Sequence, residues 1–415
     1  MTSDWQEVVL RDVTESITVG HVGPMADEYV ESGIPFLRSL NILPYRLNLG
    51  EVKYISPSFH ERLRKSSLQP GDVVVVRTGK PGTATVIPEH LEVANCSDLV
   101  IIRPGDGIDA RYLAYYFNSS AGQSHVDARS VGSVQKHFNI GDARRMKLRV
   151  PPPLVQERIA DILGSLDDKI EANRAMNRTL EAMAQALYRE WFVDFGPFQD
   201  EAFGDSELGR VPEGWEVGPF SRLATLHTKT IQPKEAPSTE WEHYSIPAYD
   251  AGERPAVDRG VTIKSGKYRV PPSAVLASKL NPRFPRVWLP DVQNPDVAIC
   301  STEFMPFVPV RAEWRSFLYS MIWSDPIQES IQMHASGTTP SRQRVRPTVI
   351  AKLPVLIPPA DAIDRFSRQA APLQKQRLAN LRESVTLAET RDYLLPKLLS
   401  GEIEVGTQTG AAGAL

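Results

Sequence analysis

The chain has 415 residues, a hydrophobic share of 41% and a formal net charge of −3, from 47 Lys and Arg against 50 Asp and Glu. This length predicts two or three domains with packed cores. The sequence shows no apolar run of the roughly 18–20 residues that a membrane span needs and no signal-peptide pattern. Its two cysteines, Cys96 and Cys300, exclude a disulfide framework and a zinc cage. We therefore expect a soluble, cytoplasmic protein, in which any DNA-binding surface must be a local basic patch, since dedicated DNA binders are usually basic overall.

Residues 1–150 predict a β-rich globular region, because short apolar runs such as Asp72–Val76 alternate with Pro and Gly. Arg77–Lys80 follows this run and is typical of a loop at a strand end. Lys and Arg outnumber acids from Arg129 to Arg149, a segment that contains the polar turn Gly132–Lys136. Such side chains contact phosphates and base edges in DNA. An ordinary solvated face is the alternative interpretation.

Residues 151–195 predict a long helix, which Pro151–Pro153 can begin but cannot interrupt. One track of residues recurs every seven positions, and a second track follows four positions behind it, which is typical of a coiled-coil seam. The first track is Ile159, Leu166, Asn173, Leu180 and Leu187, and the second is Leu163, Ile170, Asn177, Ala184 and Trp191. A polar Asn173 in this seam would fix the register of the helices, or it would lie at the wet edge of the seam.

The rest of the chain repeats this layout. We expect a linker over residues 196–213, a second globular region over 214–358, a second helix over 359–400 and a flexible tail over 401–415. Ser278–Arg283 corresponds to the first strand-end loop, and the basic turn Gly337–Arg344 lies in a segment without acids from Ser330 to Ala360. The second seam is Phe366, Leu373, Asn380, Leu387 and Leu394, and Pro372 predicts a kink or break near the start of its helix.

Four pairs of similar motifs occur in the same order in the two halves of the sequence, which indicates a duplication. Trp5 and Trp215, Ala94–Ser97 and Ala298–Ser301, the two basic turns, and the two Pro-Pro signals are separated by about 204 to 210 residues. We therefore predict an α+β fold with a pseudo-two-fold internal repeat, in which two mixed, β-rich domains are separated by two long antiparallel coiled-coil helices. Helices of some forty residues would span about 60 Å.

No catalytic or metal site is expected in this chain. Gly79–Gly82 lacks the spacing of a phosphate loop, and Asn281–Phe284 only partly matches the Asn-Pro-Pro-Phe tetrapeptide of adenine methyltransferases. The histidines do not cluster with Cys, Asp or Glu at the spacing of metal ligands.

Several stretches resemble the specificity subunits of type I restriction–modification systems. They are Pro151–Leu163, Leu166–Ile170, Leu187–Phe195, Glu207–Glu216 and Arg391–Glu402. The resemblance implies two target recognition domains that read a bipartite site in double-stranded DNA, and a helix pair that sets their spacing and docks two methyltransferase subunits. S-adenosylmethionine would be bound by those partners, and ATP and Mg by a separate restriction (motor) subunit, so that this chain itself would hold no cofactor.

Loop position and charge select the residues expected to contact DNA. They are Arg77, Lys80, Ser133, Gln135, Lys136, Lys279, Asn281, Thr338, Thr339, Arg342 and Arg344. Two other functions stay open. A stand-alone adaptor would use the coiled coil to join two protein-binding domains, and a fused methyltransferase–specificity protein would need a longer chain with cofactor motifs.

Overall fold

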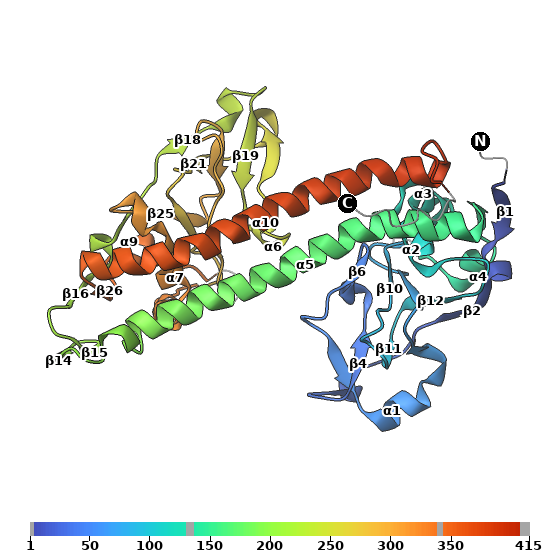
Figure 1. Ribbon diagram of the computed structural model, residues 1–415, viewed down its shortest axis with the longest axis horizontal. Helices are drawn as coiled ribbons and strands as arrows, with labels where there is room; N and C mark the ends of the chain where they lie inside the picture. The colour runs from blue at the N-terminus through green and yellow to red at the C-terminus, as the bar shows by residue number, and fades with distance from the viewer. Residues whose placement is uncertain (1–3, 130–136, 338–342, 407–415) are drawn as a thin grey trace, which may run out of the picture. The chain divides into compact units, whose positions relative to one another are not determined.

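The computed structural model describes residues 4–129, 137–337 and 343–406 and divides the chain into two units. Unit 1 comprises Met1–Glu171 and Ser384–Leu415, and unit 2 comprises Ala172–Glu383. The strands of unit 1 are blue to cyan in Figure 1, and those of unit 2 are green to orange. Because each long helix contributes to both units, the units do not coincide with the predicted domains, whose boundaries stay a prediction.

Unit 1 contains a four-stranded sheet in the order β10-β9-β12-β2 and a five-stranded sheet in the order β3-β7-β4-β11-β8. Strand β1 pairs with β13, and β5 pairs with β6. The strands are β1 Gln6–Val9, β2 Thr14–Val19, β3 Tyr29–Val30, β4 Ile34–Leu37, β5 Ile42–Leu43, β6 Arg46–Leu47, β7 Lys53–Ile55, β8 Ser67–Leu68, β9 Val73–Val76, β10 Ala84–Val86, β11 Ala94–Cys96, β12 Leu99–Pro104 and β13 Lys147–Val150.

Helices cover the four-stranded sheet of unit 1. Asp109 caps helix α2, because its carboxylate accepts a hydrogen bond of 2.7 Å from the backbone N–H of Tyr112. The apolar face of α2 packs on β9 and β10, together with Ile159 and Leu163 from the long helix α5 and Leu395 from α10. The helices are α1 Pro57–Arg62, α2 Ala110–Asn118, α3 Ser120–Arg129, α4 Ile140–Arg144 and α5 Pro153–Phe192, with 3-10 turns η1 Leu10–Val13, η2 Ala26–Glu28, η3 Ser39–Asn41 and η4 Arg64–Ser66.

Unit 2 repeats the four-stranded sheet in the order β17-β25-β22-β23 and four strands of the five-stranded sheet, whose order is β18-β21-β24-β19-β20. The fifth strands differ, because β18 pairs with β21 whereas β3 of unit 1 pairs with β7 at the opposite edge. Its strands are β14 Phe203–Ser206, β15 Gly209–Pro212, β16 Glu216–Pro219, β17 Ala224–Leu226, β18 Thr230–Ile231, β19 Glu240–Tyr244, β20 Ala256–Arg259, β21 Lys267–Arg269, β22 Val275–Ser278, β23 Val287–Trp288, β24 Ala298–Cys300, β25 Phe304–Pro309 and β26 Pro354–Ile357. Its helices are α6 Ile246–Asp250, α7 Arg315–Trp323, α8 Asp325–Met333, α9 Pro347–Ile350 and α10 Ala360–Ser400, with 3-10 turns η5 Gly196–Phe198, η6 Phe220–Arg222, η7 Pro233–Glu235, η8 Gly260–Thr262 and η9 Ala312–Trp314.

The repeat extends to strand direction and confirms the predicted α+β fold. In the five-stranded sheets, β11 runs parallel to β4 and β24 runs parallel to β19, whereas the other strand pairs of the two sheets are antiparallel. The two buried cysteines, Cys96 and Cys300, end β11 and β24. A duplicated sequence therefore produces a duplicated topology.

The two long helices run antiparallel within each unit. Asp167 of α5 pairs with Arg391 of α10 in unit 1, and Glu181 pairs with Arg377 in unit 2, so residue numbers rise along one helix as they fall along the other. Helix α10 continues unbroken through Pro372, so the predicted break is wrong. Since Pro372 lies on the exposed face, water can hydrate the Arg368 carbonyl that lacks its usual donor.

Two segments are more ordered than their predicted roles imply. The expected linker 196–213 contains the β14–β15 hairpin and places Phe198 and Val211 in the core of unit 2. In the expected tail, Ile403 and Val405 pack against the core of unit 1. Both segments contain apolar residues, and these anchor the backbone to the neighbouring core.

Candidate nucleic-acid interface

The loop predicted after the apolar run of unit 1 is the tip of the β9–β10 hairpin. Gly79 and Gly82 have positive φ angles of 94° and 86°, which glycine adopts without strain. Backbone hydrogen bonds from Val76 to Thr83 and from Gly82 to Val76 close the turn, at 2.8 and 3.0 Å. Lys80 is exposed at this tip, so its ammonium group is accessible to solvent.

The basic segment of unit 1 joins the hairpin. The backbone N–H of Phe138 donates to the Arg77 carbonyl at 3.1 Å, and the Thr78 hydroxyl hydrogen-bonds His137 Nδ1 at 3.0 Å. Two segments about sixty residues apart are therefore neighbours, as a shared DNA-contacting surface requires. The candidates Ser133, Gln135 and Lys136 lie outside the described residues, immediately before His137.

Unit 2 brings its two predicted segments together in the same way. The backbone N–H of Val345 donates to the Lys279 carbonyl at 3.1 Å, and that of Asn281 donates to the Gln343 carbonyl at 2.8 Å. Lys279 therefore occupies the place of Arg77, and Val345 that of Phe138. Asn281 has a positive φ of 49°, and its Oδ1 is a buried acceptor without a partner among the described residues. The candidates Thr338, Thr339 and Arg342 fall outside the described residues.

Each interface also contains an acid that the sequence analysis missed. In unit 1, Arg77 Nη1 lies 3.1 Å from Asp98 Oδ1. In unit 2, the Arg344 guanidinium makes a two-pronged contact with Glu303, with Nε–Oε2 at 3.0 Å and Nη2–Oε1 at 3.1 Å. The hydrogen bonds and charge of Glu303 raise the pKa of Arg344. Asp98 immediately precedes β12 and Glu303 immediately precedes β25, so the two acids are equivalent in the repeat.

A signal for these acids is present in the sequence. Ser97 and Asp98 follow Cys96, and Ser301, Thr302 and Glu303 follow Cys300, so both repeated cysteine motifs end on a hydroxyl side chain and an acid. The partner of each acid could not be read in this way, because Arg77 comes from the hairpin in unit 1 and Arg344 comes from the basic turn in unit 2.

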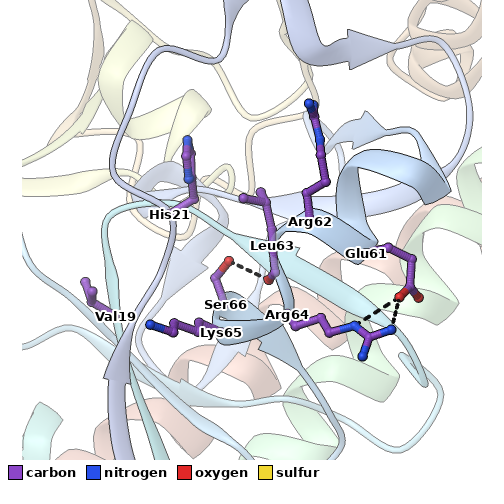
Figure 2. A pocket seen from close by; sticks show the side chains of 8 residues that line it. All are labelled: Val19, His21, Glu61, Arg62, Leu63, Arg64, Lys65 and Ser66. Carbon is purple, nitrogen blue, oxygen red and sulfur yellow. Dashed lines mark hydrogen bonds and ion pairs between the residues drawn. The ribbon is translucent and has the colours of Figure 1, made fainter.

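A hollow of about 440 Å³ in unit 1 lies beside this interface and is lined by Val19, His21, Glu61, Arg62, Leu63, Arg64, Lys65 and Ser66 (Figure 2). The backbone connects it to Asp98, whose N–H donates to the His21 carbonyl at 3.2 Å. The cations of Arg62 and Arg64 are paired with Glu28 and Glu61. The lining of the hollow therefore combines three cationic side chains with the carboxylate of Glu61.

The predicted seam residues of both helices are buried or half-buried. They are Ile159, Leu166, Asn173, Leu180, Leu187, Phe366, Leu373, Asn380, Leu387 and Leu394. Asn173 and Asn380 are only 2% and 3% exposed, which excludes the wet-edge interpretation. The Asn380 amide donates to Asn177 Oδ1 at 2.9 Å, and the Asn173 amide donates to Glu383 at 2.8 Å. The helix pair of unit 2 thus contains a buried, hydrogen-bonded polar layer.

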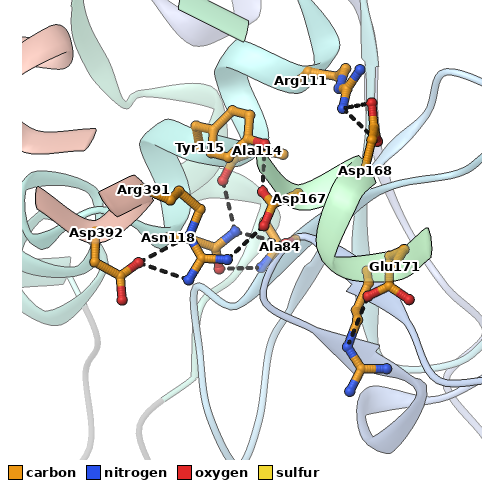
Figure 3. Close-up of polar contacts among 11 residues, drawn as sticks. Ala84, Arg111, Ala114, Tyr115, Asn118, Asp167, Asp168, Glu171, Arg391 and Asp392 are labelled. Carbon is orange, nitrogen blue, oxygen red and sulfur yellow. Dashed lines mark hydrogen bonds and ion pairs between the residues drawn. The ribbon is translucent and has the colours of Figure 1, made fainter. Parts of the chain in front are cut away.

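Each unit also joins its helix pair to its globular part through a tyrosine, a carboxylate and an arginine. In unit 1, the Tyr115 hydroxyl donates to Asp167 at 2.6 Å, and Asp167 pairs with Arg391 at 2.6 Å (Figure 3). In unit 2, the equivalent Tyr319 donates to Glu181 at 2.8 Å, and Arg377 lies 3.4 Å from this carboxylate.

Arg377 also binds Glu253 at 2.6 Å. Burial raises the pKa of the Glu253 carboxyl, whereas the Arg377 guanidinium opposes that shift.

The described residues do not gather the groups of a metal or thiol centre. No cluster of three or more His, Cys, Asp or Glu side chains among them could hold a metal ion. Burial raises the pKa of the Cys96 and Cys300 thiols, which disfavours the reactive thiolate. No helix in the described part of the chain is both long and apolar enough to cross a membrane.

Comparisons with known proteins agree with this architecture. The crystal structure of the S subunit of the type I restriction–modification system from M. genitalium has the same fold, with a TM-score of 0.57 at 12% identity over 95% of this chain and 96% of that chain. A family model for the type I restriction modification DNA specificity domain matches residues 2–182.

Two curated relatives match the chain along almost its whole length. The MjaIX specificity subunit of Methanocaldococcus jannaschii, a type I restriction enzyme subunit, is 25% identical over 97% of this chain and 94% of the relative. The HindI specificity subunit of Haemophilus influenzae is 23% identical over 97% of this chain and 100% of the relative.

The duplicated α+β fold is therefore the fold of the S subunit of a type I restriction–modification system. The chain is similar along almost its whole length to type I restriction–modification specificity subunits, and its residues 2–182 match the model of their DNA specificity domain. Its role is DNA specificity, and catalysis is not a function of this family of subunits.

Proposed function

We propose that the chain reads a bipartite target in double-stranded DNA, with one part of the target recognised by each unit. The observation that carries this proposal is the equivalent pairing of loops in the two repeats. Arg77 and Lys279 directly follow the equivalent strands β9 and β22, and the carbonyl of each accepts a backbone hydrogen bond from the segment that follows a basic turn. Phosphate contacts would supply affinity, and contacts with base edges would supply sequence specificity.

The chain assembles with other subunits of a restriction–modification system, and we propose that the α5–α10 pair docks two methyltransferase subunits. Those partners would bind S-adenosylmethionine and methylate adenine, and a restriction subunit would contribute ATP- and Mg-dependent translocation and cleavage. The complex would act on chromosomal DNA in the cytoplasm. The similarity to specificity subunits and the extended helix faces support this proposal.

Co-expression with a type I methyltransferase subunit, followed by single-molecule sequencing of host DNA for methyladenine, tests this function. We expect a split, asymmetric methylated motif that is present only when this chain is present. An active methyltransferase whose methylation is unchanged by deletion of this chain would favour the adaptor function instead, provided that the complex itself is shown to form.

A further inference from the structure

Both candidate interfaces contain a carboxylate, although DNA repels negative charge. We propose that Asp98 and Glu303 are positioning residues that determine specificity: each holds an arginine in a fixed orientation toward base edges and withholds it from phosphates of other DNA. This inference rests on the proposed function, because it concerns how the same two surfaces discriminate between sequences.

The position of the acid is the feature that the two repeats share. Asp98 and Glu303 both lie one residue before the fourth strand of the four-stranded sheet, counted along the chain. Their arginines come from different segments, since Arg77 directly follows β9 whereas Arg344 is the last residue of the basic turn. The two recognition regions have diverged in sequence, yet each has an arginine at the same acid. An ion pair at this place is therefore a property of the interface rather than of one loop.

The geometry suits orientation of an arginine for base recognition. The Arg344 contact with Glu303 uses two nitrogens, which fixes the plane of the guanidinium. Arg77 uses Nη1 for Asp98, and its Nε is buried without a partner in the described part of the chain. Arginine recognises guanine through a planar, two-pronged contact, for which a fixed guanidinium plane is an advantage.

Stability alone is a weak explanation for these pairs. The side chains of Arg344 and Asp98 are 46% and 44% exposed, and ion pairs that are open to solvent stabilise a fold very little. An acid beside a phosphate-binding cation also lowers the affinity of the surface for any DNA. Its presence is consistent with a surface in which discrimination matters more than total affinity.

Neutral, isosteric substitutions test this inference in the complex with methyltransferase subunits. The variants are Asp98→Asn and Glu303→Gln, and Asn fits position 98 because the φ of 54° there is one that Asn readily adopts. Glu7→Gln and Glu216→Gln are matched controls, since these exposed acids pair with Lys147 and Arg222 at equivalent strands β1 and β16. Binding is measured to a duplex with the methylated motif and to a scrambled duplex of equal length.

We expect each test variant to bind the scrambled duplex more tightly and to lose about tenfold in the ratio of specific to scrambled affinity. For the scrambled duplex, the slope of the logarithm of the binding constant against the logarithm of the salt concentration should steepen by about 0.9, because the released arginine gains one phosphate contact. The controls should keep the wild-type ratio. In an Arg77→Ala background, Asp98→Asn should leave the ratio unchanged, because the acid acts through that arginine.

The inference would be overturned if the wild-type complex prefers the target duplex and both test variants keep the same ratio of specific to scrambled affinity. That result would leave the proposed function intact. Loss of target affinity with unchanged scrambled affinity would also overturn the inference, because it would indicate direct contact of the acid with a base. A wild-type complex that does not discriminate between the two duplexes would instead refute the proposed function.

Discussion

Arg344 is the candidate contact whose surroundings the structure defines best in unit 2. Arg344→Ala should weaken binding to the target duplex by about 1–3 kcal/mol and relax the sequence requirement in one half of the motif, if the guanidinium reads a base. Fluorescence anisotropy with the assembled complex measures the affinity, and methylome sequencing measures the motif. Arg222→Ala is the matched control, because Arg222 has a similar exposure, 47%, and is also paired with an acid. Equal effects of the two substitutions would contradict the assignment.

Lys80 should behave differently from Arg344, because an exposed ammonium at a hairpin tip is suited to phosphate contact. Lys80→Ala should weaken binding to target and scrambled duplexes alike and reduce the slope of log K against log salt by about 1. A titration from low to physiological salt gives that slope, and Lys147→Ala on β13 is the control. A selective loss for the target duplex would assign Lys80 to base recognition instead.

At the scale of residues, charge and position predicted part of the interface. The strand-end loops and the basic turns were predicted separately as DNA contacts, and the hydrogen bonds of Arg77 and Lys279 show that each loop adjoins the segment after its turn. Asp98 and Glu303 were missed although both follow a repeated cysteine motif, because their arginine partners are set by the fold and not by the local sequence. DNA contact itself stays a prediction for every candidate.

At the scale of elements, heptad spacing predicted both long helices because their seam residues recur over many turns. The spacing did not predict which polar residues of the seam are paired. Arg377 of α10 lies between the seam residues Leu373 and Asn380. Its side chain is 9% exposed, and Glu181 and Glu253 pair with it from different elements. Only the folded unit brings Glu253 to that helix, so the sequence pattern could indicate a polar seam but not its partners.

Loss of the ion pairs that Arg377 makes with Glu181 and Glu253 should make the stability of unit 2 depend on pH. Arg377→Ala should destabilise unit 2 by about 3 kcal/mol near pH 7.5, because it leaves the partly buried carboxylates of Glu181 and Glu253 without this cation. Without the opposing effect of Arg377, the pKa of Glu253 should rise further. The deficit relative to wild type should therefore be smaller at about pH 5 than at pH 7.5, because a raised pKa favours the neutral Glu253 carboxyl, which needs no cation.

Tryptophan fluorescence can measure this effect in denaturant titrations at both pH values, because every tryptophan except Trp5 lies in unit 2. Arg382→Ala is the control on the same helix. Arg382 is 53% exposed and pairs with Asp291, so its loss should cost less than about 1 kcal/mol at either pH. A deficit for Arg377→Ala that is independent of pH would exclude Glu253 as its cause.

At the scale of the whole molecule, the proposed role of the helices as a spacer makes a geometric prediction. Insertion of one heptad into α5 and one into α10 lengthens each helix by about 10 Å. The gap between the two parts of the methylated motif should then grow by roughly three base pairs, at about 3.4 Å per base pair. Methylome sequencing measures the gap. An insertion of equal length in the β14–β15 turn is the control and should leave it unchanged.

The duplication predicted the two-unit organisation but not its boundaries. Repeats along the chain suggest two consecutive halves, whereas unit 1 is built from both ends of the described chain. Helix α10 crosses from one unit to the other without a break, and no change of composition marks the point. The division depends on which globular part each section of helix packs against, which is a tertiary property.

This discontinuity has a consequence during synthesis on the ribosome. The core of unit 1 includes Leu395 and Leu398, which are translated only after the whole of unit 2. Until they arrive, the apolar face around Ile159 and Leu163 lacks part of its cover. Unit 1 is therefore translated first but completed last. Between the synthesis of Leu163 and that of Leu395, the nascent chain exposes an aggregation-prone apolar face of helix α5. Chaperones or an already folded partner subunit would have their greatest effect on yield in that interval.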